Sequence, residues 1–201
     1  LSNSENHKEI LLLMRGDLQE RIKEMPDLSF YPEPYLLDNA IKNPTAFGKD
    51  NKTAIAELIA IADLNLEPYD FVEGKIKLAL KDKNPWKRYW GLIVCSSFGI
   101  QAKGLVPQIQ KILQTDEVNL VRNRAAEYLM LNKISFDQKK LKPLLENSSS
   151  ETEANLILNT ICLIKEYQPE IKFNFSKEIF PREWHDEPND LVNRRLEYLM
   201  N

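Results

Sequence analysis

The sequence predicts an all-α fold in which antiparallel helix pairs stack into a right-handed α-α superhelix. The first reason is an internal repeat, because Leu80, Leu113 and Leu145 occupy equivalent places at spacings of 33 and then 32 residues. Helix pairs of about this length are the repeating unit of α-solenoids. The second reason is that many of the 11 prolines stand where helices should begin or end, while the 6 glycines disfavour a glycine-rich sandwich or barrel.

The first 49 residues are predicted to form an N-terminal helix and a connector. A helix over 5–24 is indicated by an apolar stripe at four-residue spacing, Ile10, Met14, Leu18 and Ile22. The stretch Asp27–Tyr35 is expected to be an ordered aromatic loop, because X-Pro pairs disfavour helix. A short helix then runs from Pro34 to Ile41, where the Asn43-Pro44 pair stops it.

Residues 50–168 are predicted to hold the repeats. Three windows, which begin at Ile76, Ile109 and Leu141, each contain a helix, a short polar turn and a second amphipathic helix. One such pair cannot bury both apolar faces alone, so neighbouring pairs must stack. Helices are expected from about Asp50, Pro68 and Pro85, and then over 105–114, 117–131, 137–147 and 151–166.

Residues 169–201 are predicted to close the superhelix. The alternating segment Ile171–Phe175 is expected to be extended, and a last helix from Asp190 to Met200 is expected to cap the final repeat.

The turns inside the first two windows share charged residues. Arg88 and Arg122 follow the turns at nearly equivalent places, and Asp82 and Asp116 lie in the turns before them. In a right-handed stack an arginine at this place can reach the aspartate of the neighbouring turn, so we expect a ladder of structural ion pairs. The ladder should end at the third window, where Glu153 or Ala154 replaces the arginine.

Composition narrows the classes of function. The net charge of −3 and the pI of about 5.6 do not favour a nucleic-acid binder. No apolar run reaches the roughly 18 residues that a membrane span needs. The chain begins with Leu1 rather than Met and shows no signal peptide, which favours an origin in a longer protein and leaves its compartment open. Cys95 and Cys162 lie in apolar helical patterns and are interpreted as buried free thiols, although a disulfide remains possible.

The repeat windows resemble HEAT-like repeats, in which an aspartate turn precedes an arginine, as in DEVNLVRNRAAEYL. The phrase WKRYWGLIVCSSFG is similar to a repeat that follows the catalytic domain of many bacterial sulfatases, and LQERIKEMPDLSFYPEPYLLDNA resembles the connector after those domains. The resemblance covers most of residues 15–165 and is best to the heparan N-sulfatase (N-sulfoglucosamine sulfohydrolase) type. It implies a sulfatase catalytic domain on the N-terminal side as partner, a sulfated glycan reached through that domain, and a periplasmic or extracellular location.

The same resemblance implies that this chain is not itself an enzyme. Sulfatases need a Cys/Ser-x-Pro-x-Arg motif, and neither Cys95 (CSSFG) nor Cys162 (CLIKE) fits it. The aspartate, asparagine and histidine ligands of the family's calcium site have no matching motif either, so calcium is expected only in the parent catalytic domain. We therefore expect no catalytic residue, cofactor or metal here, and a non-catalytic C-terminal domain that packs on or orients the catalytic domain.

The candidate interface with that domain is the connector. Four large side chains lie within nine residues: Leu28, Phe30, Tyr31 and Tyr35. They either cover the open end of the superhelix or also dock the catalytic domain. If they dock it, they should form an exposed apolar patch in the isolated chain.

Two other functions stay open. The chain can be a free-standing HEAT-repeat scaffold that binds protein along a concave face. A second alternative, which we favour less, is nucleic-acid binding by the run Trp86–Trp90, extended by Arg122 and Arg124. It is considered because aromatic rings interleaved with basic side chains can stack on and hold nucleic acid. Adjacent helical residues point about 100° apart, so we expect Tyr89 and Trp90 partly in the core, with Trp90 substantially buried, and Lys87 outside. A metal at His185 is also conceivable, but a solvated side chain is favoured.

Overall fold

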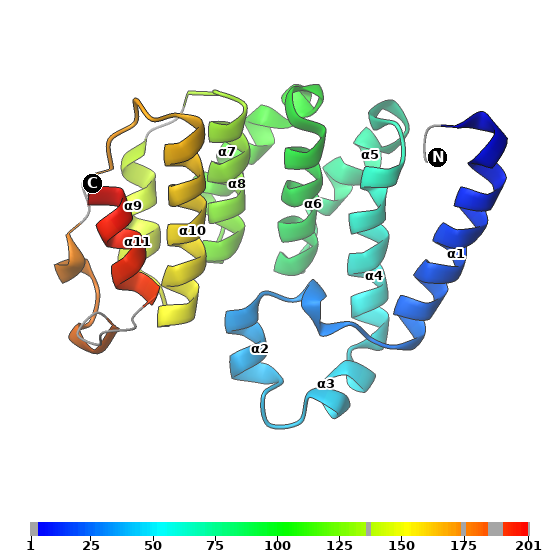
Figure 1. The fold of residues 1–201 in the computed structure, drawn as a ribbon, viewed down its shortest axis with the longest axis horizontal. Coiled ribbons are helices and arrows are strands. Elements are labelled where there is room, and N and C mark those ends of the chain that lie inside the picture. The colour runs from blue at the N-terminus through cyan, green and yellow to red at the C-terminus, as the bar shows by residue number, and fades with distance from the viewer. Residues whose placement is uncertain (1–3, 136–137, 174–175, 185–190, 201) are drawn as a thin grey trace. The chain divides into compact units, whose positions relative to one another are not determined.

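The computed structural model describes residues 4–135, 138–173, 176–184 and 191–200, and within these ranges every regular element is a helix (Figure 1). The prediction of an all-α chain is confirmed. The chain divides into two compact units, Leu1–Ala60 and Ile61–Asn201, whereas the sequence suggested a boundary after residue 49.

The first unit contains a long helix followed by shorter ones. In chain order the elements are a 3-10 turn at Glu5–His7, α1 (Lys8–Glu24), a 3-10 turn at Leu28–Phe30, α2 (Glu33–Asn39), α3 (Pro44–Asp50) and most of α4 (Lys52–Ala62). Asp27 caps the second 3-10 turn, because its side chain accepts a hydrogen bond from the Ser29 amide at 2.9 Å.

Helix α3 was not predicted, because the Asn43-Pro44 pair was read only as a stop signal. The same pair also starts a helix. Asn43 Oδ1 accepts a hydrogen bond from the Ala46 amide at 3.1 Å, and Pro44 takes the first helical position, where its missing amide proton costs nothing.

This helix also explains the position of the unit boundary. The Phe47 ring lies 5.5 Å from the Tyr31 ring, and a Cβ at Gly48 would lie 3.4 Å from a methyl carbon of Leu28. Residues 44–50 therefore pack on the connector, and α4 follows α3 after one residue, Asn51. The connector and the start of the expected repeat region consequently form one unit.

The second unit consists of helix pairs. Its helices are α5 (Tyr69–Ala79), α6 (Pro85–Phe98), α7 (Val106–Thr115), α8 (Asn119–Leu131), α9 (Leu141–Glu146), α10 (Glu151–Tyr167) and α11 (Leu191–Met200). Helices α5 and α6, α7 and α8, and α9 and α10 pack as consecutive pairs (Figure 1). The second members also pack on one another, since α8 contacts both α6 and α10, and α11 packs on α10.

Helix α8 is the centre of the second unit. Nine of its thirteen residues are buried, among them Ala125, Ala126 and the fully buried Tyr128. Small side chains let neighbouring helices approach α8 from several directions, and the aromatic ring fills the space that remains. A helix with a single apolar stripe would be buried on one face only. Because α8 is buried over most of its surface, it holds several helices together.

Short 3-10 turns connect the pairs. They lie at Asp63–Leu66, Gly99–Leu105 and Gln138–Lys140, and two more, at Lys177–Ile179 and Arg182–Trp184, lie in the segment before α11. Of the expected extended segment, Ile171–Phe173 are neither helix nor strand, and the remaining two residues lie outside the described ranges. The metal candidate His185 also lies outside them.

The run Pro85–Thr115 meets the length and composition criteria for a membrane span, with a mean hydropathy of 1.2 in its best window. It is not one continuous α-helix. Gly99 breaks it with a φ of +58°, and the two α-helical parts, α6 and α7, have 14 and 10 residues. Because about 20 residues are needed to cross a bilayer, neither α-helical part is long enough by itself.

Candidate functional site

A bidentate polar contact between two helix pairs joins Arg88 of α6 to Asp116, which lies in the turn between α7 and α8. The guanidinium donates two hydrogen bonds to the carboxylate, 2.6 Å from Nε to Oδ2 and 2.9 Å from Nη2 to Oδ1. Its Nη1 donates to the carbonyls of Asp82 and Lys83 in its own turn, at 2.8 and 3.0 Å. Only 16% of the Arg88 side chain and 5% of the Asp116 side chain are exposed. One arginine therefore fastens two successive turns.

The two aspartates of the expected ladder play similar local roles. Asp82 Oδ1 accepts a hydrogen bond from the Asn84 amide at 2.8 Å, and Asp116 Oδ1 accepts one from the Val118 amide at 3.0 Å. Each carboxylate thus accepts a hydrogen bond from the backbone amide two residues later and stabilises the turn that precedes the next helix. Asp82 also lies 3.4 Å from the ammonium of Lys87.

Arg122 departs from the expected pattern. Its Nε donates to the carbonyl of Leu113 at the end of α7, at 3.0 Å, and not to Asp82 or Asp116. The physical reason is the sequence of the next turn, where the place equivalent to Asp116 holds Ser148, which has no carboxylate. The structure therefore brings Arg88 and Asp116 together and leaves Arg122 with its own turn.

A second polar cluster, which the sequence did not predict, links α6, α8 and α10. Arg124 Nη1 donates to Glu127 Oε2 at 2.5 Å, and its Nη2 donates to the hydroxyl of Tyr89 at 2.9 Å. Thr160 of α10 donates to the same Glu127 oxygen at 3.2 Å and accepts from Asn123 Nδ2 at 2.9 Å. Each helix contributes at least one side chain, so the cluster fixes the register of three neighbouring helices.

The signal for this cluster was present but incomplete. Arg124 and Glu127 stand three residues apart, a spacing that brings helical side chains together. Their partners Tyr89 and Thr160 lie 35 and 33 residues away along the chain. Helical periodicity predicts which face a residue occupies, but not which residue of another helix lies opposite.

The aromatic run on α6 is packed into the fold. Trp86 and Tyr89 are each only 8% exposed, and Trp90 and Lys87 are half-buried. Tyr89 lies in the core as expected, and the half-buried Trp90 agrees with the position expected partly in the core, whereas Lys87 is half-buried rather than outside. Trp86 takes the inner position because its ring packs edge-on against Tyr89, with centroids 6.2 Å apart. The buried rings of Trp86 and Tyr89 cannot offer their faces to stacking bases.

The connector does not form the exposed apolar patch that docking would require. The rings of Tyr31, Tyr35 and Phe47 form a cluster with centroids 5.1 to 6.2 Å apart, and Tyr31 is 5% exposed. Leu28, Phe30 and Tyr35 are half-buried. The physical reason for this correction is the unpredicted α3, which supplies Phe47 as a packing partner within the first unit.

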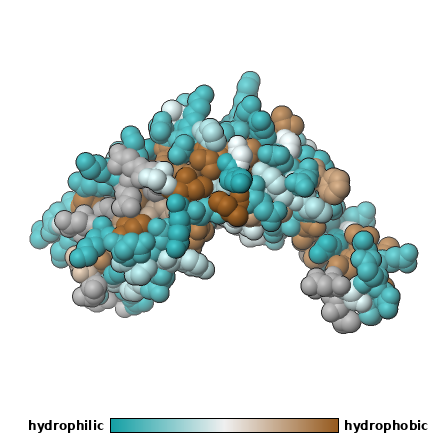
Figure 2. All heavy atoms as spheres, turned by 90° about the horizontal axis from the view of Figure 1, so that it is seen from above, coloured by the Kyte–Doolittle hydropathy of each residue, from teal (hydrophilic) through white to brown (hydrophobic). Residues whose placement is uncertain are grey.

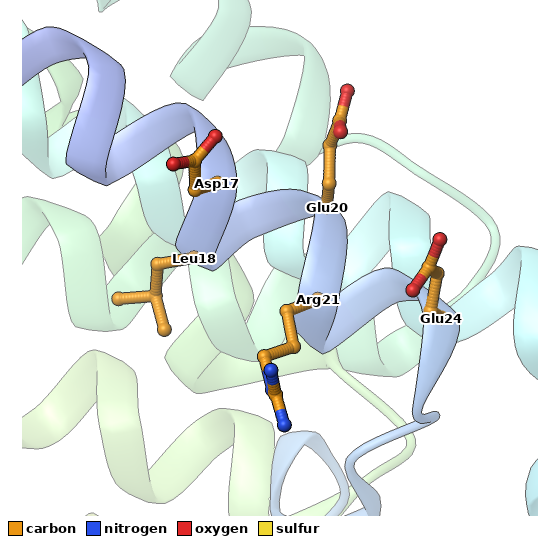
Figure 3. Close-up of a pocket in the computed structure, with 5 residues that line it drawn as sticks. All are labelled: Asp17, Leu18, Glu20, Arg21 and Glu24. Atoms are coloured by element: carbon orange, nitrogen blue, oxygen red, sulfur yellow. The ribbon is translucent and has the colours of Figure 1, made fainter.

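Helix α1 carries most of the large apolar residues that are exposed in the first unit, and Met25, Leu37 and Ile41 outside it are exposed as well. None of its seventeen residues is buried, and Leu12, Leu13 and Met14 are 56%, 69% and 66% exposed. A shallow groove on this helix is lined by Asp17, Leu18, Glu20, Arg21 and Glu24, and Figure 3 shows the three carboxylates on one side and Leu18 and Arg21 pointing the other way. Apolar side chains also lie exposed between hydrophilic ones elsewhere on the surface (Figure 2).

The cysteines are free thiols, which confirms the sequence interpretation in part. Cys95 is fully buried and Cys162 is half-buried. Burial raises the pKa of Cys95 to about 12, so this thiol stays protonated and is a poor nucleophile. Among the described residues, no group of three His, Cys, Asp or Glu side chains is placed to hold a metal ion.

Comparison with known proteins gives no relative for this chain. No protein-family model matches it, and neither the curated proteins nor the solved structures contain a match.

Proposed function

We propose that this chain is a non-catalytic module built as a right-handed α-α superhelix of HEAT-like type, and that it works by holding a neighbouring protein domain. The observation that carries the proposal is the bridge from Arg88 to Asp116, which fastens one helix pair to the next through buried charge-assisted hydrogen bonds. The repeat spacing of 33 and 32 residues supports the superhelical arrangement.

The use of the polar residues also supports a structural role. Arg88, Asp116, Arg124 and Glu127 all bind side chains or turns of their own fold, and two of these contacts join residues 28 and 35 positions apart. Groups that are engaged in this way make a stiff array of helices. Stiffness suits a module that keeps an attached domain in one orientation.

The resemblance to sulfatases makes the proposed partner specific. The attached domain is a sulfatase catalytic domain of the heparan N-sulfatase type, which supplies its own calcium and acts on a sulfated glycan. In this proposal only the parts of Leu28 and Phe30 that stay exposed contact that domain, because the packing of α3 covers much of the connector, and Tyr31 serves the internal ring cluster. A free-standing scaffold remains the alternative, and nucleic-acid binding the least supported one.

The test has two parts. The reading frame upstream of the Leu1 codon should encode an alkaline-phosphatase-like catalytic domain, and a frame without one would leave only the scaffold. The purified chain should release no sulfate from N-sulfoglucosamine or aryl sulfates, with or without calcium. Turnover that a point change within this chain abolishes would overturn the non-catalytic reading.

A further inference from the structure

Two helices of this chain carry exposed faces with matching chemistry. On α5, residues 71, 74, 75 and 78 share one face because they follow the spacing i, i+3, i+4 and i+7. Phe71 is 79% exposed and Leu78 is 71% exposed, and the exposed Lys75 lies between them. Two further exposed lysines, Lys77 and Lys81, and the exposed Asp70 flank this face. The exposed Glu73 lies on the far side of the helix, so lysines outnumber carboxylates around the face. We call this face, with its two flanking lysines, the α5 basic face.

On α1 the same spacing gives an acidic counterpart. Residues 9, 12, 13, 16 and 20 follow it and line one shallow groove together with Asp17. Leu12 and Leu13 are 56% and 69% exposed, and three carboxylates, of Glu9, Asp17 and Glu20, surround them. We call these six residues the α1 acidic face.

Each face contains a glycine that its own chain does not require. A Cβ added at Gly16 or at Gly74 would meet no atom within 4 Å. A glycine inside a helix costs about 0.5–1 kcal/mol relative to alanine, and this cost is unexplained by packing at either place. Glycines on facing helices allow two backbones to approach closely.

From these observations we propose that the chain self-associates, with the α1 acidic face of one copy packed on the α5 basic face of a second copy. The apolar residues supply the centre of the contact, and the lysines and carboxylates surround it as a polar rim. Helix α5, with 11 residues, is about 17 Å long, and α1, with 17 residues, is about 25 Å long, so the shorter face fits along the longer one.

The partner is a second copy because opposite charges of both faces are present on one chain. Like charges directly opposed would disfavour a contact of α1 with α1 through this face, or of α5 with α5. This inference goes beyond the proposed function and does not depend on it, since self-association can occur with or without a catalytic domain.

The experiment is a charge exchange. Variant A carries Glu9→Lys, Asp17→Lys and Glu20→Lys, and variant B carries Lys75→Glu, Lys77→Glu and Lys81→Glu. All six residues are exposed, so both variants should fold, which far-ultraviolet circular dichroism and melting curves check. Sedimentation velocity over a wide range of concentrations at low salt then gives the mass of each species.

The wild type should associate as its concentration rises, and added salt should weaken the association because rim charges are screened. Variants A and B should each be monomeric, because their two faces then have the same sign. An equal mixture should associate again, since the basic α1 of A matches the acidic α5 of B. A wild type that is monomeric throughout, or a mixture that stays monomeric, overturns the proposal.

A matched control removes the effect of net charge. Variant C carries Lys140→Glu, Lys172→Glu and Lys177→Glu, three exposed positions on segments that do not pack on α5, and has the same net charge as variant B. Variant C should associate like the wild type, because both of its faces are unchanged. If variant C is monomeric like variant B, the loss of association comes from net charge rather than from the α5 basic face, and the proposal is wrong.

A second pair of variants tests the apolar centre. The double change Phe71→Ser with Leu78→Ser should raise the dissociation constant of self-association about tenfold or more, as expected for the loss of a central aromatic anchor. Ile100→Ser, at a residue that is 60% exposed outside both faces, should leave it unchanged. Equal effects of the two changes would contradict the contact proposed here.

Discussion

Helices α8 and α1 are similar in amino-acid composition but lie in opposite environments. Both mix charged residues with a leucine-rich apolar set, yet α8 buries nine of thirteen residues and α1 buries none of seventeen. The difference lies in the residues between the large ones. Ala125 and Ala126 let helices approach α8, and Arg124, Asn123 and Glu127 find partners on α6 and α10. Amphipathic periodicity therefore predicts a helix, but not whether its own chain covers it.

The largest expected effect concerns the covered helix. Tyr128→Ala should lower the free energy of unfolding by about 3–5 kcal/mol, because it removes a fully buried aromatic side chain from the centre of the second unit. Chemical denaturation of the purified chain measures it. Leu13→Ala in α1, where the side chain is 69% exposed, should change the free energy of unfolding by less than about 0.5 kcal/mol. Similar losses from the two changes would mean that the contrast in burial does not exist in solution.

The polar cluster that holds α8 to α10 should matter less than the buried ring. Thr160→Val keeps the shape of the side chain but removes the hydroxyl that donates to Glu127 and accepts from Asn123. The loss should be about 1–3 kcal/mol, because two buried polar groups lose a partner. Thr152→Val, at a partly exposed position of the same helix, is the control. A neutral result at Thr160 would show that the cluster adds nothing to stability.

Sequence predicted the starts of the helices better than their contacts. The Asn84-Pro85 pair starts α6 as expected, with Asn84 Oδ1 accepting from the Trp86 amide at 2.9 Å, and Ser150 caps α10 through the Glu153 amide at 3.2 Å. These signals are local, so one stretch of chain contains all the information. Asn43-Pro44 failed because the same pair ends one helix and begins another. The cluster around Glu127 was missed because its members lie on three helices.

The bridge between turns should contribute a smaller amount. Asp116→Asn keeps one oxygen to accept from the Val118 amide but removes the charge that holds Arg88. We expect a loss of about 1–2 kcal/mol, in the range of hydrogen bonds to charged groups. Asp82→Asn should cost less than about 1 kcal/mol, because its ion pair with Lys87 is more exposed. Equal losses would mean that the bridge to the next turn is no stronger than a surface pair.

The smallest expected effect is the gain from replacing a glycine in the uncovered helix α1, a gain that the same change in the covered helix α6 should not give. Gly16→Ala in α1 should stabilise the monomer by about 0.4–1 kcal/mol, because alanine restricts the unfolded chain and its Cβ meets nothing within 4 Å. At Gly91 in α6 the added Cβ would lie 3.3 Å from the Cβ of Ala79 and 3.2 Å from a methyl carbon of Leu80. The cost of overpacking there, about 1–3 kcal/mol, should cancel or exceed the same gain.

Thermal unfolding of both variants, at a salt concentration that keeps the chain monomeric, measures the pair. The extra methyl group should lower the thermal stability at the covered position in α6 or leave it unchanged, and should raise it at the uncovered position in α1. If Gly16→Ala destabilises the monomer, then something within the chain packs on α1 after all. The face of α1 would then be an internal contact, and the difference between α1 and α8 would be one of degree.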